Sequence, residues 1–219
     1  MPMASRTLAK LRSLHPGAFE SRVVRLPLPE SDAALVSHLR TDPGSARAML
    51  FDRYAADVER VLCRILGPDS EIDDLLHEVF IVAITSIDTL RDAGRLRSWM
   101  IGIAVHKARK LIRQRKIRRL VRLVAPHELH DYEAASATAE VSEALRQTYR
   151  VLAQLPTDER IAFTLRQIDG MELLAIAEQT RVSLATVKRR VARAQKTFVT
   201  LARQNETLAE WLEPGTVPQ

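Results

Sequence analysis

The stretch from Leu155 to Phe198, LPTDERIAFTLRQIDGMELLAIAEQTRVSLATVKRRVARAQKTF, decides the fold of the C-terminal half. It contains short apolar-periodic segments separated by a tight polar break, which predicts helices joined by a turn. Ser183 is placed to cap the last of these helices. The apolar stripe of that helix consists of Leu184, Val187, Val191 and Ala194. This layout is typical of a helix-turn-helix whose second helix enters a groove of DNA.

The same stripe predicts which side chains of the last helix point outward: Ala185, Thr186, Lys188, Arg189, Ala192 and Arg193. A basic face of small residues can enter the major groove, where Arg and Lys pair with guanine edges. The alternative is a basic, solvated helix in a three-helix bundle. The helix cap, the turn before it and the basic outer face all fit a helix-turn-helix, which favours the DNA-binding interpretation.

Composition sets the wider limits. The chain has 219 residues and a formal net charge of +6, which suggests a polyanionic partner but also suits a merely soluble basic protein. Cys63 is the only cysteine, so neither an intrachain disulfide nor a cysteine-based zinc site can form. We expect Cys63 to be a buried small hydrophobe beside Leu62 and Ile65.

Several classes of function lack any sequence signal. No apolar run approaches the roughly 18 residues that span a bilayer, and no secretory signal is visible, so we expect a cytoplasmic protein without membrane insertion. His127 and His130 have no third ligand at metal spacing. No catalytic constellation or glycine-rich phosphate loop is present. We therefore expect no metal, no cofactor, no small-molecule substrate and no enzymatic activity.

Apolar periodicity in the N-terminal half predicts four helices between Asp32 and about Arg119, starting near Ser31, Ala46, Asp69 and Leu96. The predicted fold class is all-α, with two small helical domains joined by a flexible acidic linker. The expected divisions are an N-terminal extension (1–30), a first domain (31–120), the linker (121–143), a helix-turn-helix domain (144–203) and a C-terminal tail (204–219).

Charge is segregated along the chain. Seven acidic residues and one basic residue lie between Asp69 and Asp92, whereas nine basic residues and no acidic one lie between Gly102 and Leu123. The acidic surface should repel nucleic acid and the basic one attract it. Nine positive charges could neutralise several phosphates. We expect Trp99, near the start of the basic helix, to pack against the third helix.

The chain resembles the bacterial RNA polymerase sigma factors, specifically the small two-domain extracytoplasmic-function group of the sigma-70 family. The resemblance covers residues 34–119 and 145–201, which together are most of the chain. The strings that carry it are DDLLHEVFIVAI (73–84), LRSWMIGIAVHKARKLIRQRK (96–116), LPTDERIAFTLRQIDG (155–170), IAEQT (176–180) and TVKRRVARAQK (186–196).

This resemblance implies three sets of functional residues. The acidic third helix would dock on core RNA polymerase through Asp74, His77, Glu78 and Phe80. The loop and fourth helix would engage the −10 promoter element and help open it through Leu90, Arg91, Arg95, Arg97, Ser98, Trp99, Lys107 and Lys110, with a base taken out of the stack. The last helix would read the −35 element through Ser183, Thr186, Lys188, Arg189 and Arg193.

The resemblance therefore implies a promoter-specificity subunit whose partners are core RNA polymerase, promoter DNA and an anti-sigma factor. Two other readings stay open at this point. A stand-alone DNA-binding regulator would give an operator footprint without polymerase, and its N-terminal half would serve dimerisation or ligand binding. A nucleic-acid enzyme would need a catalytic constellation. The acidic helix beside a basic one favours the promoter-specificity subunit, since a simple repressor has no need of a polymerase dock.

Overall fold

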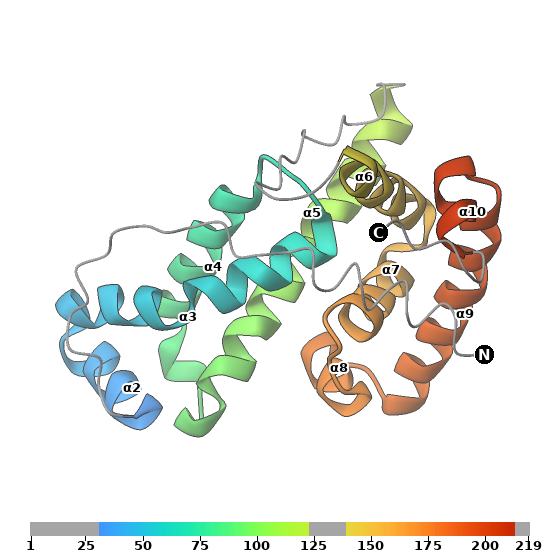
Figure 1. The fold of residues 1–219 in the computed structure, drawn as a ribbon. Helices are drawn as coiled ribbons and strands as arrows, with labels where there is room; N and C mark the ends of the chain where they lie inside the picture. Colours follow the sequence, from blue (N-terminus) through green and yellow to red (C-terminus); the bar gives the residue numbers. More distant parts are fainter. Residues whose placement is uncertain (1–30, 123–138, 213–219) are drawn as a thin grey trace.

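The computed structural model describes residues 31–122 and 139–212, and every regular element within them is helical. The N-terminal half consists of α2 (Asp32–Thr41), α3 (Pro43–Leu66), α4 (Ile72–Thr85), the 3-10 turns η1 (Ile87–Thr89) and η2 (Ala93–Arg95), and α5 (Leu96–Arg122). The C-terminal half consists of α6 (Ala139–Gln154), α7 (Thr157–Phe163), the π-helical turn η3 (Thr164–Ile168), α8 (Leu173–Thr180), α9 (Leu184–Arg203) and α10 (Glu206–Leu212). The predicted all-α fold is confirmed, and Figure 1 shows the two halves.

Local chemistry sets the helix ends of the N-terminal half. The Ser31 hydroxyl accepts a backbone N–H three residues on, at 3.2 Å, and so caps α2. Pro43 occupies the first turn of α3, where its missing N–H leaves no helical bond unmade. Gly67 ends α3 with a φ of 80°, a left-handed conformation that a residue with a Cβ rarely adopts.

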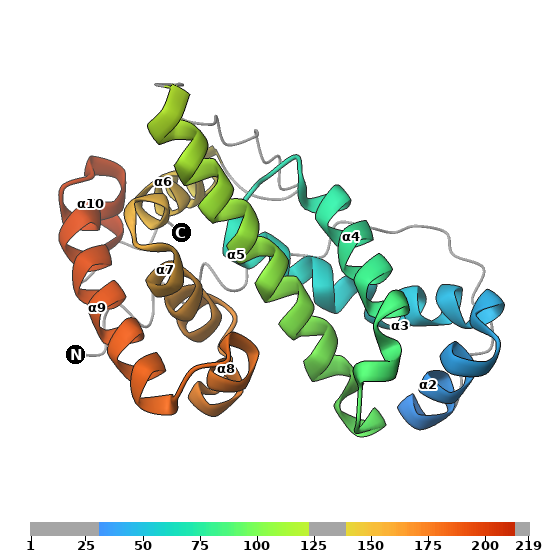
Figure 2. The same ribbon diagram turned by 180° about the vertical axis from the view of Figure 1, so that it is seen from behind.

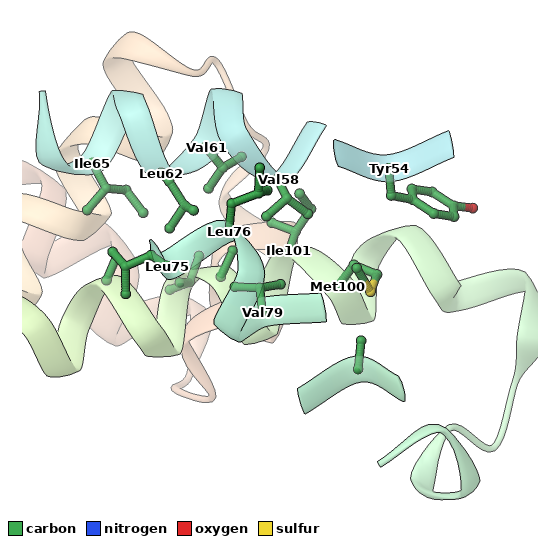
Figure 3. Close-up of a cluster of buried hydrophobic side chains, with 14 of the residues drawn as sticks. Tyr54, Val58, Val61, Leu62, Ile65, Leu75, Leu76, Val79, Met100 and Ile101 are labelled. Atoms are coloured by element: carbon green, nitrogen blue, oxygen red, sulfur yellow. The ribbon is translucent and has the colours of Figure 1, made fainter. Parts of the chain in front are cut away.

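Helices α3, α4 and α5 pack around an aliphatic core. Figure 3 shows side chains of α3 above those of α4, with α5 beside them; the labelled contacts include Val58, Leu62, Ile65, Leu75, Val79, Met100 and Ile101. Burying each such side chain contributes about 1.5–3 kcal/mol. Cys63 is partly rather than fully buried, at the edge of this core, and desolvation raises the pKa of its thiol to about 12, so the thiol is neutral.

The C-terminal half has a second core between α6, α7, η3, α9 and α10. Phe163 and Phe198 stack there with ring centroids 5.1 Å apart. Leu208 of α10 is buried in the same cluster, so this part of the predicted tail contributes to the fold. None of the helices in the described residues is long and apolar enough to cross a membrane.

Several predicted details were wrong. Helix α4 begins at Ile72 rather than at Asp69, because the Asp69 carboxylate accepts the N–H of Glu71 and forms a turn first. Leu184, which was predicted to belong to the apolar stripe, is 37% exposed, since it lies at the first turn of its helix. Helices α5 and α6 extend into the predicted linker at 121–122 and 139–143, and its middle (123–138) lies outside the described residues.

The two halves share one apolar cluster. Ile161, Leu165 and Ile176 of the C-terminal half belong to the same buried cluster as the core of α3, α4 and α5. Figure 2 shows α5 running between α4 on one side and α7 and α8 on the other. The halves are therefore packed together rather than joined by a linker alone.

Candidate nucleic-acid interface and partner surfaces

The helix-turn-helix is formed by α8, a turn and α9. Arg181 follows α8 in the left-handed conformation (φ 55°, ψ 45°), which reverses the chain direction. The Ser183 hydroxyl accepts the N–H of Thr186 at 3.2 Å and so begins α9 at the predicted residue. Val187 and Val191 are buried as predicted, which fixes the rotation of the helix about its axis.

The opposite face of α9 is open. Lys188, Arg189 and Arg193 are exposed, and among the described residues none of these three forms an ion pair. Ala192, on the same face, has a small side chain, so a nucleic-acid backbone can come close to the helix. Arg190, in contrast, turns back and pairs with Asp158 at 3.0 Å. The buried face of α9 holds the helix in place, and the unpaired cations project from its opposite face. Such an arrangement suits contact with phosphates and guanine edges.

A second basic region lies at the start of α5. A cleft of about 720 Å³ is formed by the loop before α5, by α5 itself and by the end of α8. Seven of the eight predicted −10 residues line it: Leu90, Arg91, Arg95, Ser98, Trp99, Lys107 and Lys110. The C-terminal half contributes Glu178, Gln179 and Arg181 to the same cleft. The sequence prediction thus found side chains that the fold brings together.

Two of the predicted −10 residues are placed differently from the others. Arg97 does not line the cleft; its Nε donates to the Asp57 carboxylate at 2.6 Å, and this guanidinium holds the pKa of Asp57 below its usual range. Leu90 is only 5% exposed and belongs to the core, while its carbonyl accepts a bond from Arg40. Trp99 is half-buried, packing on the core as predicted and lining the cleft with the rest of its surface.

Most cations of α5 already have partners. Lys107 Nζ lies 2.7 Å from a Glu78 oxygen, Arg115 pairs with Asp69 and Glu71, and Arg109 and Arg113 pair with Asp158. Burial lowers the pKa of Arg109. The predicted separation of acidic and basic surfaces is therefore incomplete, because α4 and α5 neutralise part of each other's charge.

The exposed face of α4 combines acidic and apolar groups. Asp74, His77 and Glu78 are exposed as predicted, but Phe80 is only 5% exposed and supports Phe51 from beneath, with ring centroids 4.9 Å apart. Sequence reasoning missed Ile81, which is 61% exposed on this face.

Phe51 was missed as well; it is 36% exposed and stacks on His77 at 6.5 Å. The position of Ile81, four residues after His77, could have shown that the two share a helix face. Exposed apolar side chains ringed by charges are typical of a protein-binding surface. No group of three or more His, Cys, Asp or Glu side chains in the described residues could hold a metal ion, and His127 and His130 lie outside them.

Two family models match this chain, one in each half. The model of Sigma-70 region 2 matches residues 50–118, and that of Sigma-70 region 4 matches residues 145–197. The chain is 29% identical over 175 residues to the ECF RNA polymerase sigma-E factor of Escherichia coli K12, covering 76% of this chain and 91% of that protein. The sigma-E factor of Haemophilus influenzae is 27% identical over 175 residues, covering 76% of this chain and 92% of that protein.

Two solved structures share the fold. One is CnrH in complex with the cytosolic domain of CnrY, with a TM-score of 0.57 and 22% identity, over 80% of this chain and 99% of that one. The other is the sigma factor RpoE in complex with the anti-sigma factor NepR from Bartonella quintana, with a TM-score of 0.54 and 16% identity, over 71% of this chain and 96% of that one.

Proposed function

The chain belongs to the sigma-70 family, in its extracytoplasmic-function group, and is a transcription initiation factor rather than an enzyme; from this premise we propose that it binds core RNA polymerase, recognises −10 and −35 promoter elements and promotes DNA melting. Residues 31–120 form the unit that binds polymerase and the −10 element. Residues 144–203 form the unit that reads the −35 element, and 121–143 connect the two.

The observation that carries the proposal is the open cationic face of α9. Lys188, Arg189 and Arg193 project from a helix whose other side is buried, within the segment that matches Sigma-70 region 4. Ser183 and Thr186, at the helix N-terminus, are placed to donate to a phosphate. The side chains further along the helix would reach base edges in the major groove.

The cleft at the start of α5 supports −10 recognition and melting. Arg91, Arg95 and Lys110 surround a half-buried Trp99, which combines cations for phosphates with a ring on which a base can stack. Extruding a base from the duplex costs a few kcal/mol, which such contacts can offset. Lys107 would have to exchange Glu78 for a phosphate to take part.

The exposed face of α4 supports polymerase binding. Asp74 and Glu78 supply negative charge, and Ile81 and Phe51 supply apolar surface around His77. This mixture suits a protein partner with a basic, partly apolar surface, and it would repel the promoter phosphates. We assign Phe80 a supporting role beneath Phe51 rather than direct contact.

The proposal includes an anti-sigma partner. One of the two similar structures contains CnrH bound to the cytosolic domain of CnrY, and the other contains RpoE bound to NepR. In each, a chain of this fold binds a partner protein. A partner that covers the surfaces described above would block polymerase and promoter together.

In vitro transcription with bacterial core RNA polymerase on a promoter library tests the proposal. We expect initiation at promoters that share a two-part motif, and only when the chain and the core enzyme are both present. Lys188→Ala with Arg193→Ala should abolish the upstream half of that motif while polymerase association persists. Failure to initiate, together with a sharp footprint by the chain without polymerase, would instead establish a stand-alone regulator.

A further inference from the structure

One large apolar side chain lies on the exposed surface of α9. Leu184, the first residue of the helix after the Ser183 cap, is 37% exposed. It belongs to neither of the two buried clusters, so it contributes little to the core of the described residues. A single exposed leucine is common on protein surfaces and has no meaning by itself. Its position on a helix that faces DNA gives it one.

The exposed neighbours of Leu184 are either small or cationic. Over the first three turns of α9 they are Ala185, Lys188, Arg189, Ala192 and Arg193. The alanines leave room beside the leucine, and the cations attract phosphates and guanine edges. On these three turns Leu184 is therefore the one large apolar group of a surface that is otherwise suited to polar contacts.

The rotation of α9 places Leu184 on the same side as Lys188. The two residues are four positions apart, so they lie one turn apart on one face of the helix. Val191, also near this side, is 8% exposed, whereas Leu184 is open because it lies in the first turn. The N-terminal residues of a recognition helix are those that contact base edges in the major groove. Leu184 is therefore placed to meet a base rather than a phosphate.

The floor of the major groove offers one apolar group, the C5-methyl group of thymine. The other groups that distinguish base pairs there are hydrogen-bond donors or acceptors. A leucine against one of these removes water from a polar group and returns no hydrogen bond, which is unfavourable. A leucine against the methyl group buries apolar surface on both sides. The side chain of Leu184 therefore fits a T·A pair and disfavours a G·C pair.

We infer that Leu184 is a specificity-determining residue that selects a T·A pair in the −35 element by packing on the C5-methyl group of thymine. Lys188 selects a guanine close to it. The two side chains are about 6 Å apart along the helix axis, and stacked base pairs are about 3.4 Å apart, so the two base pairs lie within about two steps of each other. The inference rests on the proposed function, because it takes α9 as the helix that reads the −35 element.

Uracil in place of thymine tests this contact, because the substitution removes the methyl group and keeps every hydrogen-bonding group of the base. The promoter is one selected from the library by core RNA polymerase together with this chain. Each thymine of its upstream motif, on either strand, is replaced in turn. The thymine and uracil templates compete in one transcription reaction with limiting holoenzyme and give transcripts of different length. The ratio of the transcripts measures the relative rate of initiation at the two templates.

We expect one thymine at which the uracil template initiates about fourfold less, the value that corresponds to burial of one methyl group. In Leu184→Ala, whose side chain is too short to reach the groove floor, this preference should disappear. Leu184→Met keeps a long apolar side chain and should keep the preference. Exchanging the transcript lengths between the two templates controls for effects of length.

Leu174 offers a matched control. It is 63% exposed, it lies in the first turn of α8, and it belongs to neither buried cluster. Leu174→Ala thus removes the same apolar side chain from the exposed start of a helix that is not the recognition helix. We expect this chain to keep the preference of about fourfold for the thymine template. Loss of the preference in Leu174→Ala as well would overturn the assignment to Leu184.

Selection with Lys188→Ala locates the second base pair. The promoters recovered with this chain should lose the preference for guanine at one position of the upstream motif. That position should lie within about two base pairs of the methyl-sensitive thymine. A guanine position farther away would contradict the shared helix face of Leu184 and Lys188 and overturn the inference.

The outcomes separate this inference from the proposed function. An upstream motif without a T·A pair, a motif in which uracil has no effect, or an unchanged uracil effect in Leu184→Ala would reject the role of Leu184 and leave the proposed function intact. Initiation that depends on no upstream motif would reject −35 recognition, and the inference with it. A uracil effect that is lost in Leu184→Ala and kept in Leu174→Ala upholds both.

Discussion

Helices α5 and α9 are both rich in Arg and Lys, yet the fold treats their charges in opposite ways. In α5, Lys107, Arg109, Arg113 and Arg115 all pair with carboxylates of α4, α7 or the turn before α4. In α9, the outward cations Lys188, Arg189 and Arg193 form no ion pair within the described residues. Charge counted along a sequence therefore does not measure charge available to DNA. What matters is whether a carboxylate from another element lies within reach.

The largest expected effect comes from the carboxylates that hold the paired cations. Asp169→Asn leaves Arg64, whose side chain is 9% exposed, without its carboxylate, and should lower the free energy of unfolding by about 3 kcal/mol. Asp158→Asn removes pairs that are more exposed and should cost about 1 kcal/mol. Urea denaturation followed by circular dichroism measures both. Equal losses of unfolding free energy would show that burial does not determine how much each ion pair contributes to stability.

The open face of α9 should matter mainly for promoter choice. Lys188→Ala with Arg193→Ala should reduce transcription from a recognised promoter by about thirtyfold, since a base contact contributes roughly 1–3 kcal/mol. Exposed Arg150 and Arg203 offer a control with the same change in net charge away from this face. A similar loss in Arg150→Ala with Arg203→Ala would mean that total charge, not the α9 face, sets the activity.

Salt dependence separates open from paired cations in a single titration. For duplex DNA bound by the free chain, Lys188→Ala should lower the slope of log K against log salt by about 0.9, the value expected for one lost phosphate contact. Arg113→Ala should leave the slope unchanged, because its guanidinium pairs with Asp158 in the free chain. An equal decrease in slope for both variants would contradict the distinction between the open cations of α9 and the paired cations of α5.

The smallest expected effect is on Arg97, which the resemblance assigned to the −10 element together with the cleft residues. Arg97→Ala should change promoter opening by less than about twofold, because an exposed ion pair with Asp57 contributes little. Arg91→Ala, at the cleft, should reduce opening by about fivefold, as expected for one lost hydrogen bond. Permanganate reactivity of promoter thymines gives both values. A larger loss for Arg97→Ala would restore its assignment to the −10 surface.

Local signals in the sequence predicted much of the fold. Ser183 caps the helix that it was expected to cap, because a side-chain cap depends only on the next three residues. The stripe of Val187, Val191 and Ala194 is buried, since helical periodicity fixes a helix face. The same reasoning failed for Leu184, because periodicity does not say where the neighbouring helix ends.

Contacts between distant residues could not be predicted in the same way. Arg64 meets Asp169 across 105 residues of sequence, and Lys107 meets Glu78 across 29. No spacing rule relates such pairs, because their approach depends on how whole helices pack. For the same reason the resemblance could not show that Arg97 lies away from the cleft, where its Nε donates to Asp57.

The central claim is that α4 binds polymerase and α9 binds DNA. Titrating core RNA polymerase with two doubly charge-reversed chains tests this claim most directly. One carries Asp74→Arg and Glu78→Arg on α4, and the other carries Lys188→Glu and Arg193→Glu on α9; Glu78→Gln controls for the lost contact with Lys107. Our account predicts at least tenfold weaker holoenzyme assembly for the α4 chain and normal assembly for the α9 chain. Normal assembly by the α4 chain, or equal weakening of both, would contradict it.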